Sequence, residues 1–109
     1  MFAEVKDYLM ISGNDYDSQI RTQIYAAVQD LTATADIILP GTVSISIDPQ
    51  SKTVTDNSTI SDDYAITAIA LWCAIHIGNP TNIKELRDSY KAIKGNMSRS
   101  SVYSTYDAE

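Results

Sequence analysis

Residues 61–80 read SDDYAITAIALWCAIHIGNP, and this stretch decides the fold of the chain. Ser61 offers a helix N-cap, and the two aspartates after it favour the positive end of a helix dipole. Gly78 accepts the left-handed cap conformation and Pro80 cannot continue the hydrogen-bond ladder, so both end the helix. Between these signals, residues 64–77 are apolar on nearly every side. Such a helix has no face to present to water and must lie at the centre of the fold.

Two helical patterns precede this stretch. Apolar residues at intervals of three and four predict a short helix over residues 2–10. The turn residues that follow place Asp15 or Asp17 to cap a longer helix. In that helix apolar residues recur from Ile20, and it ends before Pro40.

The segment between the second and third helices has a different composition. Residues 40–61 contain nine Ser or Thr and no aromatic residue. Polar and apolar residues alternate over Val43–Ile47 and again over Lys52–Thr55, and the residues between them have turn chemistry, which predicts a β-hairpin. A lone two-stranded hairpin is marginally stable in water, so we expect it to lean on another surface.

A fourth helix and a tail complete the chain. Asn79 or Thr81 is placed to cap a helix whose apolar residues form a narrow seam from Ile83 to Met97. Residues 98–109 have no helical period but carry apolar side chains that are costly to leave in water. We expect them to add as an extended strand to the sheet edge of a partner, with a mobile end of no role as the alternative.

The predicted fold is therefore mainly α, a small bundle of about four helices with a hairpin insertion and an extended C-terminal tail. Residues 1–97 form the helical domain, which includes the insertion at 40–61, and residues 98–109 form a docking tail. The residues expected in the core are Val5, Leu9, Ile20, Ile24, Val28, Leu31, Ile66, Ile69, Leu71, Trp72, Cys73, Ile83, Leu86, Tyr90 and Ile93.

The charges are unevenly distributed. Fourteen acidic and eight basic residues give a net charge of -6, but residues 64–99 carry five bases and two acids. An acidic chain is a poor general binder of nucleic acid. Opposite charges on two parts of one molecule suit head-to-tail contacts between copies.

Compartment and membrane signals are weak. The lone cysteine cannot form an internal disulfide, the N-terminus lacks a basic segment followed by an apolar one, and the longest apolar run is shorter than the roughly 20 residues that span a bilayer. We expect a cytosolic, soluble protein that does not contact membranes.

No arrangement of residues favours an enzyme. Cys73 and His76 lie three apart and could form a dyad, but a thiolate needs an electropositive, partly exposed setting, so a core cysteine and a packing histidine are favoured. The paired aspartates precede helices and suit capping. We expect no metal or cofactor. Lys84, Arg87, Lys91 and Lys94 form a basic helix face, either solvated or in contact with nucleic acid. Trp72 suits core packing or an interface anchor.

Several short motifs, taken in order, resemble a known family. They are an N-terminal Glu4-Val5-Lys6-Asp7-Tyr8-Leu9 helix, an acidic loop at 14–17, a long helix, an apolar helix ending in Gly78-Asn79-Pro80, a Leu86-x-x-x-Tyr90-x-x-x-Lys94-Gly95 helix and a tail rich in Ser and Tyr. In this order and spacing the chain resembles the small head-tail connector proteins (adaptor or head-completion proteins) of tailed bacteriophages and prophages. Residues 40–61 match no motif of that family.

The resemblance implies a structural subunit of a dodecameric ring below the portal, which extends the DNA channel and offers a platform to the next head-completion or tail protein. Its partners would be copies of itself, the portal protein, that downstream protein and the passing genomic DNA, without sequence-specific binding. It would occur in the bacterial cytoplasm during assembly and then at the head-tail junction of the virion. The residues expected at the subunit or portal interface are Val43, Ile45, Ile47, Val54, Lys84, Arg87, Lys91, Lys94, Val102, Tyr103 and Tyr106. The alternatives are a small helical DNA-binding regulator that reads DNA with the fourth helix, and a small enzyme built on Cys73 and His76.

Overall fold

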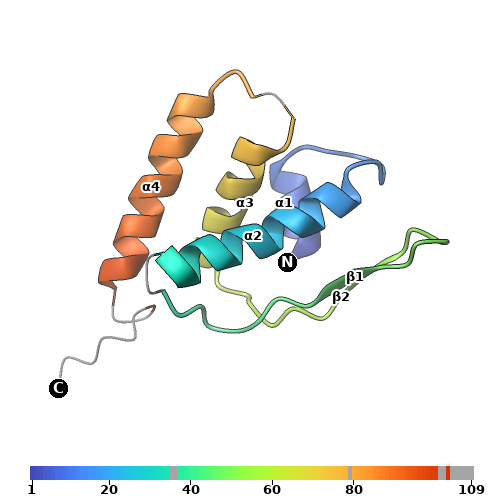
Figure 1. The fold of residues 1–109 in the computed structure, drawn as a ribbon, viewed down its shortest axis with the longest axis horizontal. Coiled ribbons are helices and arrows are strands. Elements are labelled where there is room, and N and C mark those ends of the chain that lie inside the picture. The colour runs from blue at the N-terminus through green and yellow to red at the C-terminus, as the bar shows by residue number, and fades with distance from the viewer. Residues whose placement is uncertain (35–36, 79, 101–102, 104–109) are drawn as a thin grey trace.

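The computed structural model describes residues 1–34, 37–78, 80–100 and 103, and over these it consists of four helices and one two-stranded hairpin (Figure 1). The elements in chain order are α1 (Phe2–Tyr8), α2 (Asp17–Thr34), β1 (Ile45–Ile47), β2 (Val54–Asp56), α3 (Asp63–His76) and α4 (Ile83–Arg99). The predicted mainly α fold, with a hairpin between the second and third helices, is confirmed.

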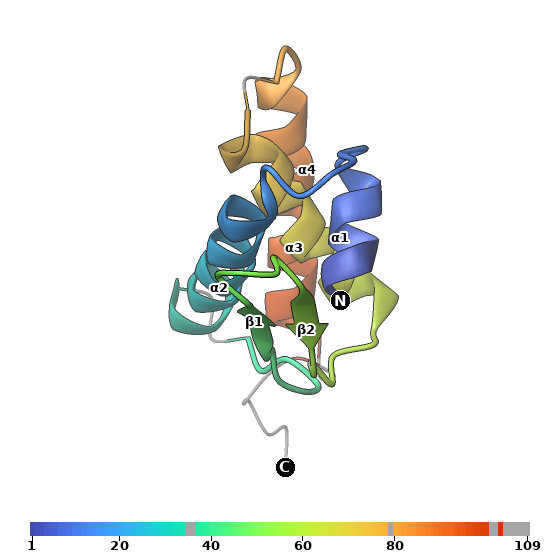
Figure 2. The same cartoon turned by 90° about the vertical axis from the view of Figure 1, so that its right-hand side faces the viewer.

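Helix α3 lies at the centre, as its composition requires. α1 and α2 flank it on opposite sides (Figure 2), and α4 packs along it in the reverse direction after the turn at the top of Figure 1. Ala65, Ala68 and Ile69 of α3 are fully buried. The small alanine side chains let neighbouring helices approach closely, while the isoleucine fills the space between them.

The cap of α3 is Asp62 and not the expected Ser61. Asp62 has extended backbone angles, and its carboxylate accepts a hydrogen bond of 3.0 Å from the Ala65 N–H. At the other end Gly78 has a φ of 75°, the left-handed conformation expected for the glycine that ends this helix. Asn79, one of the two caps predicted for α4, lies outside the described residues; Asn82 takes the cap position without a side-chain hydrogen bond.

Other boundaries differ by a turn or less. α1 ends at Tyr8, because Met10 adopts a φ of 59° that no helix contains. α4 continues past the expected end at Met97 to Arg99. Asp17 does not cap α2; its carboxylate is buried and forms a 2.8 Å ion pair with Lys6, which joins α2 to α1.

The core contains most of the expected residues. Leu9, Val28, Trp72, Ile83, Leu86 and Ile93 are partly buried at its edge, and the other expected members are buried. The expected set left out other buried residues, both within the helical patterns and in the connections between elements. The larger of the missed core residues are Phe2, Ile37, Leu39, Ile45, Ile60, Ile75, Ile77, Met97 and Tyr103.

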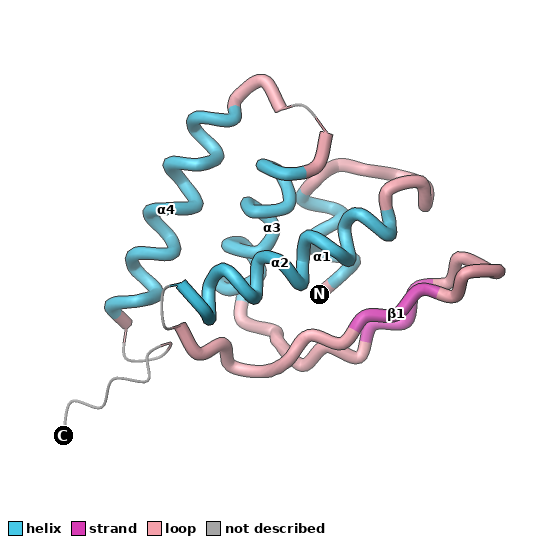
Figure 3. Tube along the Cα trace, viewed as in Figure 1, coloured by secondary structure: helices cyan, strands magenta, loops and turns pink. Residues whose placement is uncertain are grey.

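The hairpin runs out beyond the helices and its tip is far from α4 (Figures 1 and 3). β1 and β2 are antiparallel, with Ile45 opposite Asp56 and Ile47 opposite Val54. The Asp48 carboxylate closes the tip by accepting hydrogen bonds from the N–H groups of Gln50 and Ser51. β2 lies further along the chain than the alternation over Lys52–Thr55 predicts.

The two segments that connect the hairpin to the helices stay in contact before β1 and after β2. Thr42 and Thr59 exchange hydrogen bonds of 2.8 and 2.9 Å. Gly41 has a φ of 135°, and a Cβ there would lie 2.9 Å from the backbone nitrogen of Ile60. Only glycine fits at this crossing.

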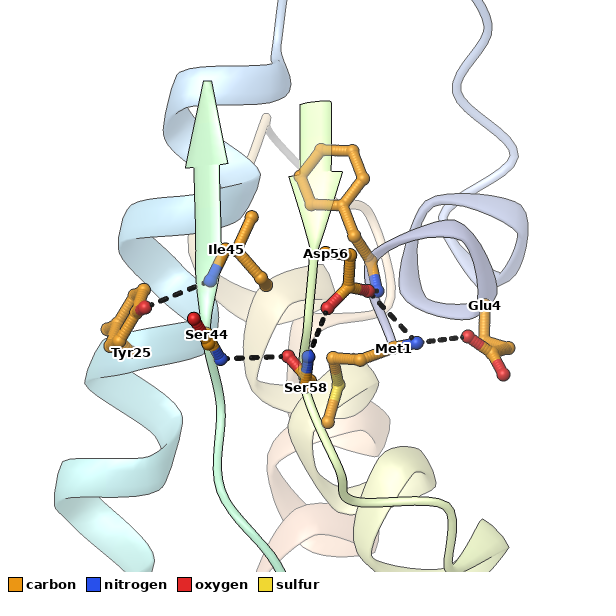
Figure 4. Close-up of polar contacts among 8 residues, drawn as sticks. Met1, Glu4, Tyr25, Ser44, Ile45, Asp56 and Ser58 are labelled. Atoms are coloured by element: carbon orange, nitrogen blue, oxygen red, sulfur yellow. Dashed lines mark hydrogen bonds and ion pairs between the residues drawn. The ribbon is translucent and has the colours of Figure 1, made fainter. Parts of the chain in front are cut away.

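The hairpin is anchored to its own chain rather than left for an outside partner. Ile45 is buried in the core; its N–H donates to the Tyr25 hydroxyl (3.1 Å), and its carbonyl accepts from Arg21 Nε (2.6 Å). On the other strand, Asp56 accepts from the backbone N–H groups of Phe2 (2.7 Å) and Ser58 (3.0 Å). The Met1 amino group lies between the carboxylates of Asp56 and Glu4 (Figure 4).

Tyr103, expected in a docking tail, lies buried against the body of its own chain. Its carbonyl accepts a 2.6 Å hydrogen bond from the Ile38 N–H, its hydroxyl donates to the Asp62 carboxylate, and its ring stacks on Tyr64. The other tail residues predicted to dock, Val102 and Tyr106, lie outside the described residues.

Lowering the pH tests the anchor at Asp56. Burial opposes ionisation of this carboxyl, but hydrogen bonds from the Ser58 side chain and from the Phe2 and Ser58 backbones outweigh it and lower the pKa to about 2. The unfolded state therefore binds the proton first as the pH falls. We expect the free energy of unfolding to drop by about 2 kcal/mol between about pH 4 and pH 2, and this drop to be missing in Asp56→Asn. Urea denaturation at a series of pH values measures it.

The control for this experiment is Asp7→Asn, because the Asp7 side chain is exposed and its carboxylate has no hydrogen-bond or ion-pair partner among the described residues. It should keep the wild-type pH dependence. Identical slopes in wild type and Asp56→Asn would contradict the assignment.

The contact of Tyr103 predicts that the end of the described chain contributes to stability. Tyr103→Phe removes a donor from the Asp62 carboxylate, and a hydrogen bond to a charged group contributes about 1.5–3 kcal/mol. Chemical denaturation should show a loss of this size, whereas Tyr16→Phe, at an exposed ring, should show none. A Tyr103→Phe protein as stable as wild type would show that the hydroxyl is equally well solvated in both states.

Candidate functional site: a basic aromatic cleft

A cleft of about 270 Å³ opens where α3 and α4 meet the last half of α2. We call it the basic cleft. It is lined by Asp30, Trp72, Ile75, His76, Arg87, Tyr90, Lys91 and Lys94.

Trp72 forms the apolar wall of the basic cleft. Its ring stacks on His76 with 4.1 Å between centroids and lies 5.5 Å from the Tyr90 ring. Its Nε1 donates a 2.9 Å hydrogen bond to Gln23, so the polar end of the indole is satisfied inside the subunit. Trp72 is half-buried: it packs against the core and also lines the cleft.

The floor of the cleft is a closed polar network. The Asp30 carboxylate accepts from the Tyr90 hydroxyl (2.5 Å) and from Lys94 Nζ (2.9 Å). Burial, together with the Asp30 carboxylate, raises the pKa of Tyr90, so the hydroxyl stays a donor at every physiological pH. The positive charge of Lys94 is therefore largely neutralised by Asp30 of the same chain.

Two of the cations that line the cleft have no ion-pair partner among the described residues. Arg87 and Lys91 are exposed and form no ion pair within the described part of the chain, whereas Lys84 pairs with Asp88 at 3.0 Å outside the cleft. Of the four basic residues predicted as one interface face, the structure thus gathers three at the cleft and leaves Lys84 apart.

A second surface, at the loop of residues 9–16 between α1 and α2, is acidic. In Figure 1 this loop lies to the right of α3, and some of its residues line a hollow together with Leu86 of α4. Asp15 is exposed in the loop and Asp7 is exposed just before it. Tyr8, Met10 and Tyr16, which neighbour these aspartates in the chain, are exposed, Met10 by 91%. The three side chains line one hollow, whereas Asp15 lines another together with Lys52 of the hairpin tip. From here on, the name acidic loop means residues 7–16, which are the last two residues of α1 and the loop after it.

The hairpin residues predicted at an interface lie elsewhere. Ile45 is buried in the core, and Val43, Ile47 and Val54 are half-buried. Val43 lines a separate apolar groove of about 520 Å³ between α2 and the arms of the hairpin, where Ile38 is half-exposed. The hairpin thus packs mainly against its own chain.

The residues considered for a catalytic dyad lie in different surroundings. Cys73 is fully buried, and burial raises the pKa of its thiol to about 12. His76 is exposed, and its Nδ1 lies 2.8 Å from the Trp72 carbonyl oxygen. The thiol at this position is therefore not ionised at neutral pH.

Within residues 1–34, 37–78, 80–100 and 103, no group of three or more His, Cys, Asp or Glu side chains could hold a metal ion. No helix there is long and apolar enough to cross a membrane.

The chain matches no protein-family model, and neither a curated protein nor a solved structure is significantly similar to it.

The burial of Cys73 predicts a thiol that does not react in the native state. We expect negligible labelling by a maleimide at neutral pH and complete labelling in denaturant, because both access and the thiolate are lacking in the folded protein. A Lys91→Cys variant, with its new thiol exposed, should label rapidly at one site and serves as the control. Fast labelling of the native wild-type chain would contradict the placement of Cys73.

Proposed function

We propose that this chain is a structural subunit of a head-tail connector ring of a tailed bacteriophage or prophage. The observation that supports this most is the agreement between the resemblance and the fold. The chain resembles the connector proteins in the order of its motifs: a helix, an acidic stretch at 14–17, a long helix, a variable insertion, an apolar helix, a turn and a basic helix. In the structure, the same order forms one helical body from α1 to α4.

The electrostatics of the molecule are compatible with this role. The chain has a net charge of -6. A conduit lined by such subunits would repel the phosphate backbone and let a genome slide through it without being held. In the proposed ring the subunits lie between the portal and a downstream head-completion or tail protein.

A DNA-binding regulator is the second candidate, and the basic cleft is the feature that would serve it. Sequence-independent affinity for duplex DNA rests on many Lys and Arg contacts to phosphates. On the cleft only Arg87 and Lys91 lack an internal ion-pair partner among the described residues, and the chain as a whole is acidic. The geometry therefore favours the structural role.

Assembly with a portal protein tests the proposal. The full chain is co-expressed with the portal protein encoded in the same genome, and the complexes are separated by sedimentation and imaged by negative-stain electron microscopy. We expect closed rings stacked on the portal. The isolated subunit should associate weakly at high concentration.

Two outcomes would refute the connector role. One is a strict monomer that does not bind the portal at any concentration. The other is salt-sensitive binding of the isolated chain to duplex DNA at nanomolar concentration, which would favour the regulator.

A further inference from the structure

We infer that the basic cleft of one subunit receives the acidic loop of a second copy of this chain. The inference rests on the proposed ring, because it names the surfaces through which neighbouring subunits meet. It follows from the unlike charges and matching aromatic surfaces at two separate places on one molecule.

The cleft has the properties of an acceptor for an acidic segment. Arg87 and Lys91 are one helical turn apart on α4, exposed and without an ion pair inside the described chain. Beside them the rings of Trp72 and Tyr90 form an apolar wall. A carboxylate that binds there gains two positive partners, and an aromatic side chain gains a flat surface to pack on.

The acidic loop has the complementary properties. Asp7 and Asp15 are exposed, and their carboxylates have no partner among the described side chains. Tyr8 and Tyr16 adjoin them and are 48% and 42% exposed. Exposed tyrosines beside carboxylates match a cleft that combines aromatic rings with cations, and aromatic residues are enriched in the centres of protein interfaces.

The two surfaces do not meet within one molecule. The hollow beside the loop is lined by Tyr8, Met10 and Tyr16 and by Leu86 at the start of α4, and it shares no residue with the cleft. Within the described part of the chain, no ion pair joins the carboxylates of the loop to Arg87 or Lys91. Contact between two unlike surfaces is heterologous, and a heterologous contact repeated through a rotation closes into a ring.

The charges favour a second copy over a nucleic acid as the occupant. A phosphate backbone needs a long track of cations, and the cleft offers two that are not already paired. Two exposed cations suit two exposed carboxylates on a small protein loop.

Charge reversal tests the inference. Arg87→Glu/Lys91→Glu replaces the two cations of the cleft with carboxylates. Asp7→Lys/Asp15→Lys replaces the two carboxylates of the acidic loop with cations. Each double variant alone should weaken self-association by at least about tenfold in sedimentation equilibrium, and a chain carrying all four changes should regain most of it. Lys84→Glu, which lies outside the cleft, is the matched control for a single Lys91→Glu and should associate as wild type does. Circular dichroism checks that the variants are folded.

Cysteine cross-linking tests the geometry directly, since the native Cys73 is buried. Asp15→Cys and Lys91→Cys proteins are mixed and oxidised, alone and on the portal. We expect the mixed disulfide dimer to exceed either like-with-like dimer, and Lys84→Cys in place of Lys91→Cys to give little. The mixed dimer should also form within portal-bound rings.

The outcomes separate this inference from the proposed function. Rings on the portal that form equally well with Arg87→Glu/Lys91→Glu and give no mixed disulfide would overturn the interface and leave the connector role standing. A wild-type chain that neither self-associates nor binds the portal would overturn both. Salt-sensitive duplex binding that is lost in Arg87→Glu/Lys91→Glu, without a mixed disulfide, would show that the cleft holds nucleic acid and overturn the inference.

Discussion

Helix α3 has no polar face, and the remaining elements of the molecule are arranged to cover it. Exposing the apolar side chains of this helix to water costs about 25 cal/mol of folding free energy per Å² of apolar surface. The helix is therefore buried over most of its surface, and only a few of its residues, such as Tyr64, Trp72 and His76, reach water. α1 and α2 cover two opposite sides of α3 and α4 covers a third (Figure 2). The ion pair of Lys6 with Asp17 links the first two of these covering helices to each other.

The end of the bundle near the start of α3 is closed by segments without regular structure. Ile37, Leu39 and Ile60 come from the connections on either side of the hairpin, and each is buried. Tyr103 returns from the far end of α4 to the Asp62 carboxylate that caps α3. The residue that caps the central helix thus also binds the end of the described chain. The two arms of the hairpin approach each other most closely at Gly41, where there is no side chain. The hairpin extends from this closed end and depends on it.

The parts of the fold that could be predicted from the sequence are those with a local signal. The apolar run of α3, the period of α4 and the turn at Gly78 each depend on residues near one another in the chain, and the structure agrees with them. The role of Asp56 and the burial of Tyr103 could not be predicted, because Phe2 lies 54 residues from Asp56 in the chain and Asp62 lies 41 residues from Tyr103. The same holds for the cleft. The sequence indicates a basic helix and a tryptophan on another helix, but only the packing of α3 against α4 brings Trp72 beside Arg87 and Lys91.

The subunit is complete as a folding unit, and this limits how strongly copies can bind one another. Its large apolar groups are mostly buried within the chain, so what is left for association is a set of exposed charges and a few half-exposed rings. Exposed ion pairs each contribute only about 0–1 kcal/mol, and they weaken as salt rises. A single contact of this kind is short-lived. In the proposed ring every subunit would make two such contacts, and a template that held subunits side by side would turn each further contact into an intramolecular one with a high effective concentration. Weak pairwise affinity would then keep the isolated chains apart in solution and restrict stable assembly to the template.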